Sequence, residues 1–409
     1  MIKPNKKVLL AVFLGALFLR LGVLVGFDSA FSRYEQADSK AYGVVALNLM
    51  KGNGFIDGSG EPTNMRPPVY PLFLAAVHTV AGPGDLAVRA LQCLADSFSV
   101  VLLMLIAGLV FNPAIALLSG VLAAVYPPFL LYANLKLTEC LFIFMVLLET
   151  YLLTRSFKER DNGKFAYAGL VHGIGVLLRS STLLLPAFLL PAVLFTGLRK
   201  SLLKGFAAYL LISSALISVW TVRNYRVFHE FLPVNTGGGW LLWDAVQDDV
   251  WDGDVMVELD PLREYPELKG LPRPEMENIV GRRVVARAIR HPLWYSGKML
   301  RNFLHLWYLP VGKVMLAGVS RTAAAAYQAA HYLLLATALL GLFCLSKRNV
   351  FAALPSLVNL LYVSVMHSMV LGIPRYRLPF DPFLLMFFAC GLFLLYGRLA
   401  GKSAAPCAD

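Results

Sequence analysis

Long apolar runs separated by short polar loops make up most of the hydrophobic pattern of the chain. A helix of about 20 residues crosses a bilayer, because each residue adds about 1.5 Å and the hydrocarbon core is about 30 Å thick. Strands are not expected to span. The pattern therefore predicts an all-α polytopic membrane protein with about ten spans, in a range of roughly 10–12. The expected spans are 1–27, 88–110, 114–132, 139–155, 165–178, 182–198, 205–222, 323–345, 350–370 and 378–397.

Two further apolar segments are predicted as interfacial helices instead of spans. Residues 68–82 would reach about 22 Å as a helix, short of the hydrocarbon core. Residues 292–312 carry Lys298, Arg301 and His305 at spacings of three and four. This spacing puts the three side chains in one polar stripe on an otherwise apolar and aromatic helix, which is typical of an amphipathic surface helix.

The basic residues set the expected orientation. Lysine and arginine gather in the loops at 155–164 and 199–204 and near both ends of the chain, and short basic loops stay on the cytoplasmic side. Both termini are therefore expected in the cytoplasm, with outer segments at 28–87 and 223–322. The whole chain, 1–409, is expected to form one membrane domain. The short basic loops and the lack of an organelle signal favour a bacterial inner membrane.

Composition narrows the class of protein. Apolar residues are 58% and charged residues 15% of the chain, against about 45–50% and 25% in soluble domains. The net charge of +12 resides mainly in the clusters that set topology, so no nucleic-acid partner is expected. The five scattered cysteines fit neither a disulfide framework nor a zinc site. Seven carboxylates between Asp244 and Asp260 do not have the spacing of an EF-hand loop. A divalent metal is thus possible but has no ligand motif, and no cofactor is firmly implied.

The first outer segment carries two candidates for chemistry. Asp38 lies about one helical turn beyond the membrane exit and four residues before Tyr42. Its carboxylate could take a proton from an attacking hydroxyl, or it could cap a helix. Arg66 heads the helix predicted at 68–82, where its guanidinium and the free helix amides could bind a phosphate. Snorkelling to lipid headgroups explains Arg66 equally well.

Other polar residues on the outer side allow similar alternatives. Lys136 and Glu139 could form a simple ion pair, or a phosphate-binding cation and a carboxylate that orients the loop. Arg375, Tyr376 and Arg377 precede the last span. Two arginines around an aromatic ring suit a phosphate leaving group, and they are also an ordinary interfacial anchor.

Arg20 and the pair Arg223 and Asn224 complete the candidates. Arg20 interrupts the first apolar run, where a charge costs about 2.5–3.5 kcal/mol, so a functional or paired role is expected. Arg223 and Asn224 open the second outer segment. The sequence has no Gly-x-Ser-x-Gly elbow, P-loop or His-Glu-x-x-His motif, so it gives no support to a membrane hydrolase or an ATPase.

Taken in order, the motifs ADSKAYGVVALNLMKGNGF, RPPVYPLFLA, TECLF, RNY before GGGWLLW, and PRYRLP resemble the membrane glycosyltransferases of the GT-C fold. The resemblance is to the branch with the protein O-mannosyltransferases and the lipid A aminoarabinose transferases. It implies a GT-C-like bundle that moves a sugar, with inversion, from a polyprenyl-phosphate donor to a hydroxyl on a lipid, glycan or protein acceptor at the outer face. Where many members have a second acid after the loop aspartate, this chain has Ser39.

The resemblance also implies roles for single residues. Asp38 matches the proposed base, and Glu139 matches an acid that shapes the site. The expected donor-phosphate ligands are Arg66, Lys136, Arg375 and Arg377, and the expected site-shaping residues are Tyr42, Glu139, Arg223, Asn224 and Tyr376. The alternative is a transporter, flippase or polymerase of polyprenyl-linked glycans. A transporter tends to have repeated halves and broken helices at its binding site, and the sequence shows neither.

Overall fold

The structure is a computed structural model that describes residues 5–33, 37–195, 199–248, 251–252, 255–256, 259–311, 320–345 and 347–400. The described residues are mostly α-helical, with short 3-10 turns and connecting loops. They also contain one antiparallel hairpin of two two-residue strands, β1 (Trp251–Asp252) and β2 (Val255–Met256). The prediction of an all-α polytopic membrane protein is confirmed.

Seven described helices are long and apolar enough to cross a membrane. They are α1 (Lys6–Arg33), α4 (Asp85–Val110), α7 (Glu139–Glu159), α10 (Arg199–Phe228), α14 (Arg321–Phe343), α15 (Lys347–Met369) and α17 (Asp381–Leu399), the last preceded by α16 (Pro374–Arg377) and the turn η5 (Leu378–Phe380). An eighth span is possible if α5 (Pro113–Val125) and α6 (Pro127–Ala133), bent by 55°, count as one. Consecutive prolines at the start of α6 explain the bend, because they cannot donate to the preceding turn.

The remaining two of the ten expected spans are shorter helices. They are α8 (Asn162–Leu178), with 17 residues, and α9 (Leu185–Phe195), which follows the turn η1 (Ser180–Thr182). By length and composition the described part of the chain thus supports seven or eight spans. α8 packs tightly on α10, because Gly169 leaves no room for a Cβ: one built there would lie 2.5 Å from the carbonyl oxygen of Tyr209.

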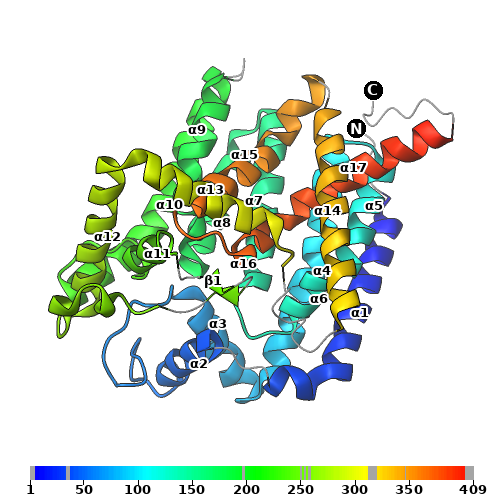
Figure 1. Cartoon of the computed structure of the whole chain (residues 1–409). Helices are drawn as coiled ribbons and strands as arrows, with labels where there is room; N and C mark the ends of the chain where they lie inside the picture. The colour runs from blue at the N-terminus through cyan, green and yellow to red at the C-terminus, as the bar shows by residue number, and fades with distance from the viewer. Residues whose placement is uncertain are drawn as a thin grey trace.

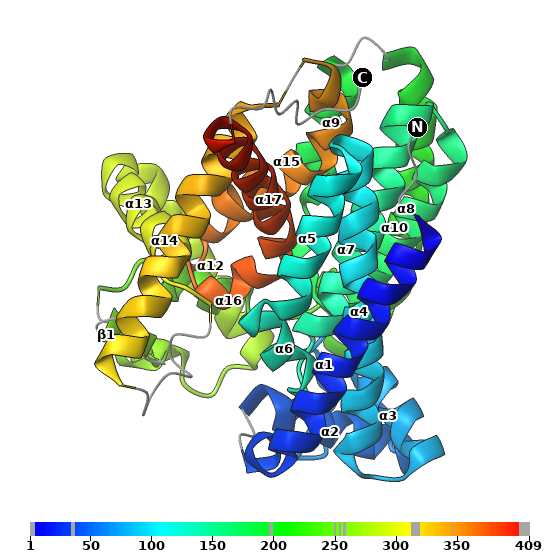
Figure 2. The same cartoon turned by 90° about the vertical axis from the view of Figure 1, so that its right-hand side faces the viewer.

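Two short helices, α2 (Ala37–Met50) and α3 (Val69–Ala81), lie together at one end of the bundle. The start of α1 and the end of α17 lie at the opposite end (Figures 1 and 2). α3 has 13 residues, too few for a span, which confirms the prediction of a short helix at 68–82. The flanking helices run farther than expected, since α1 ends at Arg33 and α10 at Phe228.

The segment between α10 and α14 packs beside the bundle. It contains α11 (Gly238–Asp244), η2 (Pro261–Arg263), η3 (Pro266–Leu268), α12 (Arg273–Arg290) and α13 (Pro292–Tyr308). α11, η3 and α12 share a small apolar core around Trp243, Leu268 and Val280. α13 packs against α15 and lies across the bundle in Figure 1.

Two residues of the predicted polar stripe of α13, Lys298 and Arg301, are bound to a carboxylate of the chain. Lys298 contacts the carboxylate of Asp248, and Arg301 Nη1 lies 3.0 Å from the same carboxylate. Arg301 Nη2 also donates to the carbonyl oxygen of Ala245 at 2.9 Å. Sequence periodicity identified the stripe, but only the packing shows that it binds the chain around α11.

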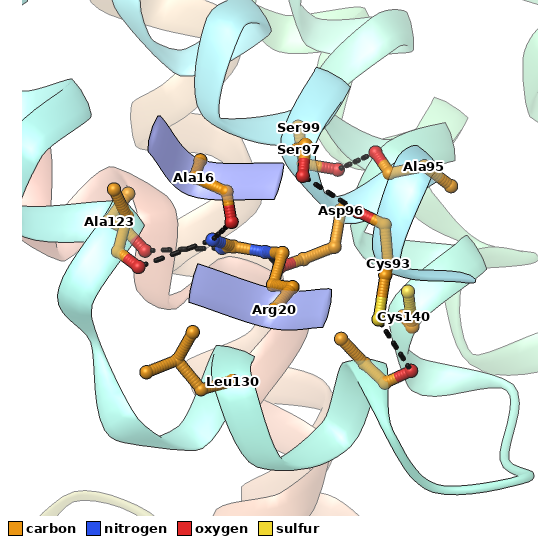
Figure 3. Close-up of polar contacts among 12 residues, drawn as sticks. Ala16, Arg20, Cys93, Ala95, Asp96, Ser97, Ser99, Ala123, Leu130 and Cys140 are labelled. Carbon is orange, nitrogen blue, oxygen red and sulfur yellow. Dashed lines mark hydrogen bonds and ion pairs between the residues drawn. The ribbon is translucent and has the colours of Figure 1, made fainter. Parts of the chain in front are cut away.

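Arg20 is a paired residue inside the bundle. Its Nε lies 2.5 Å from a carboxylate oxygen of Asp96 on α4, and both side chains are almost fully buried. Its Nη1 donates to the carbonyl oxygens of Ala16 at 3.1 Å and Ala124 at 3.2 Å. Figure 3 shows the guanidinium between α1, α4 and the end of α5. Because the charge is neutralised and its donors are used, Arg20 can stay in the bundle interior.

Candidate functional site

Two carboxylates and three arginines from five separate segments meet near the α2–α3 end of the bundle. Asp38 lies in the first turn of α2, and Glu139 is the first residue of α7. Arg66 precedes α3, Arg179 ends α8, and Arg375 lies in α16. We call these five residues the Asp38 cluster.

Both oxygens of Asp38 contact a guanidinium. Arg66 Nη2 lies 2.6 Å from Oδ1, and Arg375 Nη1 lies 3.0 Å from Oδ2. The side chain of Asp38 is 27% exposed, so a substrate can approach it. Such charge-assisted hydrogen bonds orient the carboxylate strongly.

Glu139 anchors the buried side of the cluster. Its side chain is fully buried, and one of its oxygens accepts from Arg375 Nε and, at 2.8 Å, from Arg179 Nη1. Arg179 Nη1 also donates to the Thr138 hydroxyl at 3.1 Å. Burial disfavours the charge of Arg179, but the Glu139 carboxylate outweighs it and raises the pKa of this arginine. Arg375 thus joins Glu139 to Asp38, and the five charges leave the cluster with one excess positive charge.

Aromatic rings line the cluster on two sides. The guanidinium of Arg66 lies 5.3 Å from the ring centroid of Tyr42, which in turn contacts Tyr70 edge-on at 4.9 Å. The guanidinium of Arg179 lies 5.3 Å from the ring centroid of Tyr376. Burial raises the pKa of the Tyr42 phenol, so this ring supports the arginine as a neutral group. The rings fix the arginines in place without neutralising them.

Hydrogen bonds to the turn before α7 position α2. The hydroxyl of Ser39 donates to the carbonyl oxygen of Lys136 at 2.9 Å. Gln92 of α4 donates to the carbonyl oxygen of Leu135 at 2.6 Å, which fixes the same turn from the other side. The first turn of α2, with Asp38, is thereby tied to the segment that begins α7, with Glu139.

Lys136, expected on the donor phosphate, contacts an acidic residue of α4. Its Nζ contacts Asp85 Oδ2 at 3.0 Å, at the start of α4. Asp85 also faces His78 at 3.6 Å. The described contacts of Lys136 therefore include a carboxylate outside the Asp38 cluster.

Arg377 also differs from its expected position. It is fully buried, with Nε 2.9 Å from Asp381 Oδ1 and Nη1 donating to the carbonyl oxygen of Leu306 at 2.6 Å. The reason is local: residues 374–377 form a helical turn, so side chains two positions apart point about 200° away from each other. Arg375 faces Asp38, and Arg377 faces α13. The prediction of Arg377 as a phosphate ligand does not fit this placement.

Arg223 holds the loop that carries Arg66, and Asn224 holds the segment that follows α10. Arg223 Nη1 donates to the carbonyl oxygen of Thr63 at 2.9 Å, and Nη2 donates to that of Phe55 at 3.2 Å. Asn224 Nδ2 donates to the carbonyl oxygen of Val234 at 2.8 Å. This placement is compatible with a site-shaping role, which remains a prediction.

Arg179 is the residue of the cluster that the sequence did not single out. Nothing in the short turn after α8 indicates a contact with Glu139. In the part of the chain that the structure describes, no group of three or more His, Cys, Asp or Glu side chains could hold a metal ion. Asp249, Asp254 and Glu258 of the acidic run lie outside the described residues.

Comparison with known proteins agrees with the expected fold. Residues 65–223 match the family described as dolichyl-phosphate-mannose-protein mannosyltransferase. An Archaeoglobus fulgidus oligosaccharyltransferase tethered to an acceptor peptide superposes with a TM-score of 0.61 and 14% identity, covering 99% of this chain and 52% of that one. The chain has the GT-C fold.

The comparison includes two further structures. The oligosaccharyltransferase AglB from the same archaeon, in complex with an inhibitory peptide and a dolichol-phosphate, has a TM-score of 0.58 and 15% identity over 96% of this chain and 50% of that one. ArnT from Cupriavidus metallidurans, bound to undecaprenyl phosphate, has 15% identity over 96% of this chain and 79% of that one, with a TM-score of only 0.41. The chain spans about half the length of the oligosaccharyltransferases it matches. No curated protein matches it by sequence.

Proposed function

We propose that this GT-C protein is a glycosyltransferase that moves a sugar from a polyprenyl-phosphate donor to a hydroxyl of a lipid, glycan or protein acceptor. The observation that carries the proposal is the position of Asp38, a partly exposed carboxylate between two arginines from distant segments. A general base must touch the attacking hydroxyl. Of the two carboxylates, Asp38 is accessible and Glu139 is fully buried, so Asp38 is the base and Glu139 positions the arginines.

The charges of the cluster suit the proposed reaction. The acceptor oxygen attacks the anomeric carbon as its proton passes to Asp38, and the bond between that carbon and the phosphate oxygen breaks. The polyprenyl phosphate leaves with the bonding electrons, so it needs cations and no general acid. Arg66 and Arg375 are the cations within reach of the same carboxylate as the attacking group.

Donor binding must also free the base. Without donor, each oxygen of Asp38 contacts a guanidinium. A donor phosphate attracts Arg66 and Arg375, and Glu139 keeps Arg375 and Arg179 close while this exchange takes place. With its two cations drawn toward the phosphate, Asp38 is a stronger base for the acceptor proton when the donor is present.

Among the remaining candidates, Tyr42 and Tyr376 line the site, Arg223 holds the loop that carries Arg66, and Asn224 holds the segment after α10. Arg377 ties α16 to α13 and α17. Lys136 would have to leave Asp85 to reach the phosphate, so we place it at the edge of the site, outside the Asp38 cluster.

The proposed site faces the outside of the membrane. The basic loops 155–164 and 199–204 are then cytoplasmic together with both termini, in a bacterial inner membrane. Segments 28–87 and 223–322 are the outer segments of a single membrane domain, and α3 and α13 are its interfacial helices. The dolichol-phosphate of the similar oligosaccharyltransferase structure supports a lipid-phosphate donor.

A panel of donors tests this function. The protein, reconstituted in vesicles, is given radiolabelled sugars on polyprenyl phosphates, with and without a chelator, and transfer to extracted acceptors is measured. Transfer with one donor supports the proposal, and its response to the chelator settles metal dependence. Movement of the labelled lipid across the bilayer, without transfer or donor hydrolysis, would instead support a flippase.

A further inference from the structure

One side of α13 is apolar and exposed. Leu293, Leu300 and Leu304 are 88%, 60% and 53% exposed, and their spacings of seven and four place them on one face of the helix. The opposite side carries Asn302, which is buried, and between the two sides Arg301 is bound to the chain near α11. A helix facing water would have the reverse arrangement. An exposed apolar face of this kind marks contact with lipid or with a partner.

The contacts at the end of α13 favour lipid. The ring of Tyr308 lies 5.7 Å from that of Tyr332 on α14, and Gln328 of α14 donates to the carbonyl oxygen of Tyr308 at 2.7 Å. α14 is a candidate span whose Leu333 is 62% exposed. Figure 2 shows α13 and α14 side by side. The apolar face of α13 is therefore continuous with a helix surface that meets the hydrocarbon.

The preceding helix, α12, is basic and also exposes apolar side chains. Arg282, Arg287 and Arg290 are exposed, and the aliphatic side chains of Val285 and Ile289 are exposed between them. The sequence has no acidic residue from 278 to 311. Arginines interleaved with aliphatic side chains suit the boundary between anionic headgroups and acyl chains.

We propose that α12 and α13 form a docking surface for anionic phospholipid. Arg282, Arg287 and Arg290 bind headgroup phosphates, and Leu293, Leu300 and Leu304 contact acyl chains. The charge favours an anionic lipid over a zwitterionic one, because basic side chains near an anionic membrane surface gain Coulomb energy that a neutral surface does not supply. The surface is separate from the Asp38 cluster, and its tests need no sugar transfer.

The first experiment locates the apolar face. Leu300→Cys is labelled with an environment-sensitive dye in a Cys344→Ser, Cys407→Ser background and reconstituted in vesicles. Brominated acyl chains should quench this dye at least about twofold more than the same dye on Lys269→Cys, an exposed control position outside α12 and α13. Quenching of Leu300→Cys only by a water-soluble quencher, or a signal that depends on protein concentration, would overturn the proposal in favour of a protein partner or a second copy.

The second experiment measures the headgroup preference. Spin-labelled phosphatidylglycerol and phosphatidylcholine compete for the wild type, the variant Arg282→Gln/Arg290→Gln, and the control Arg263→Gln/Lys269→Gln. The control removes the same charge from exposed residues outside α12 and α13. We expect the wild type and the control to prefer phosphatidylglycerol, and the α12 variant to lose at least about half of that preference. No preference in the wild type, or an equal loss in both variants, would refute the headgroup contact.

Discussion

Replacement of Arg375 by glutamine should weaken binding of the polyprenyl phosphate carrier. A charge-assisted hydrogen bond contributes about 1.5–3 kcal/mol. To reach a phosphate, Arg375 must give up its 3.0 Å contact with Asp38, while Glu139 remains its partner. The net effect should therefore lie at the low end, about 1.5–2 kcal/mol. This corresponds to roughly 10–30-fold in the dissociation constant.

The assay is equilibrium binding of polyprenyl phosphate to the purified protein in detergent. Arg226→Gln is the matched control, because Arg226 is exposed near the end of α10 and has no ion-pair partner among the described residues. The control should bind as the wild type does. Binding by Arg375→Gln within about twofold of the wild type would refute the assignment of Arg375 to the phosphate.

Two further predictions concern stability. Arg20→Met leaves Asp96 buried without its cation and should lower the free energy of unfolding by about 3–5 kcal/mol, whereas Arg20→Met/Asp96→Leu should recover most of the loss. Unfolding in detergent measures both variants, and equal instability of the two would contradict the pairing. Gly372→Ala should destabilise the segment before Arg375, because a Cβ there would lie 1.8 Å from the carbonyl oxygen of Asn302. Unfolding at the wild-type midpoint would show that α13 does not brace this segment.

The fold could be predicted because lipid imposes a simple rule on sequence. Runs long enough to cross the hydrocarbon were found in the right order, and the short helix at α3 followed from its length. The number of spans, ten, was harder to predict, because α8 and α9 are apolar but short. A helix can be apolar because it packs against its neighbours, as α8 does at Gly169, without crossing the whole membrane.

The site could be predicted only in part, because side chains meet across the bundle and the sequence gives only local direction. Asp38, Arg66 and Arg375 were expected on one side of the membrane, and the structure brings them into contact. Arg377 was expected with them, but the helical turn of α16 directs it the opposite way. Lys136 contacts Asp85 because the turn before α7 packs against α4. No local sequence pattern indicates this packing.

The most direct test of the account is sugar transfer by Asp38→Asn, compared with Asp57→Asn. Asp57 is a partly exposed carboxylate on the same segment that accepts from the backbone of Ser59, so its variant carries the same chemical change away from the cluster. We predict that Asp38→Asn loses about 10²–10⁴-fold in turnover. It should bind polyprenyl phosphate as tightly as the wild type or more tightly, because Arg66 and Arg375 lose a competing carboxylate. Turnover by Asp38→Asn close to that of Asp57→Asn would contradict the role of Asp38 as the base.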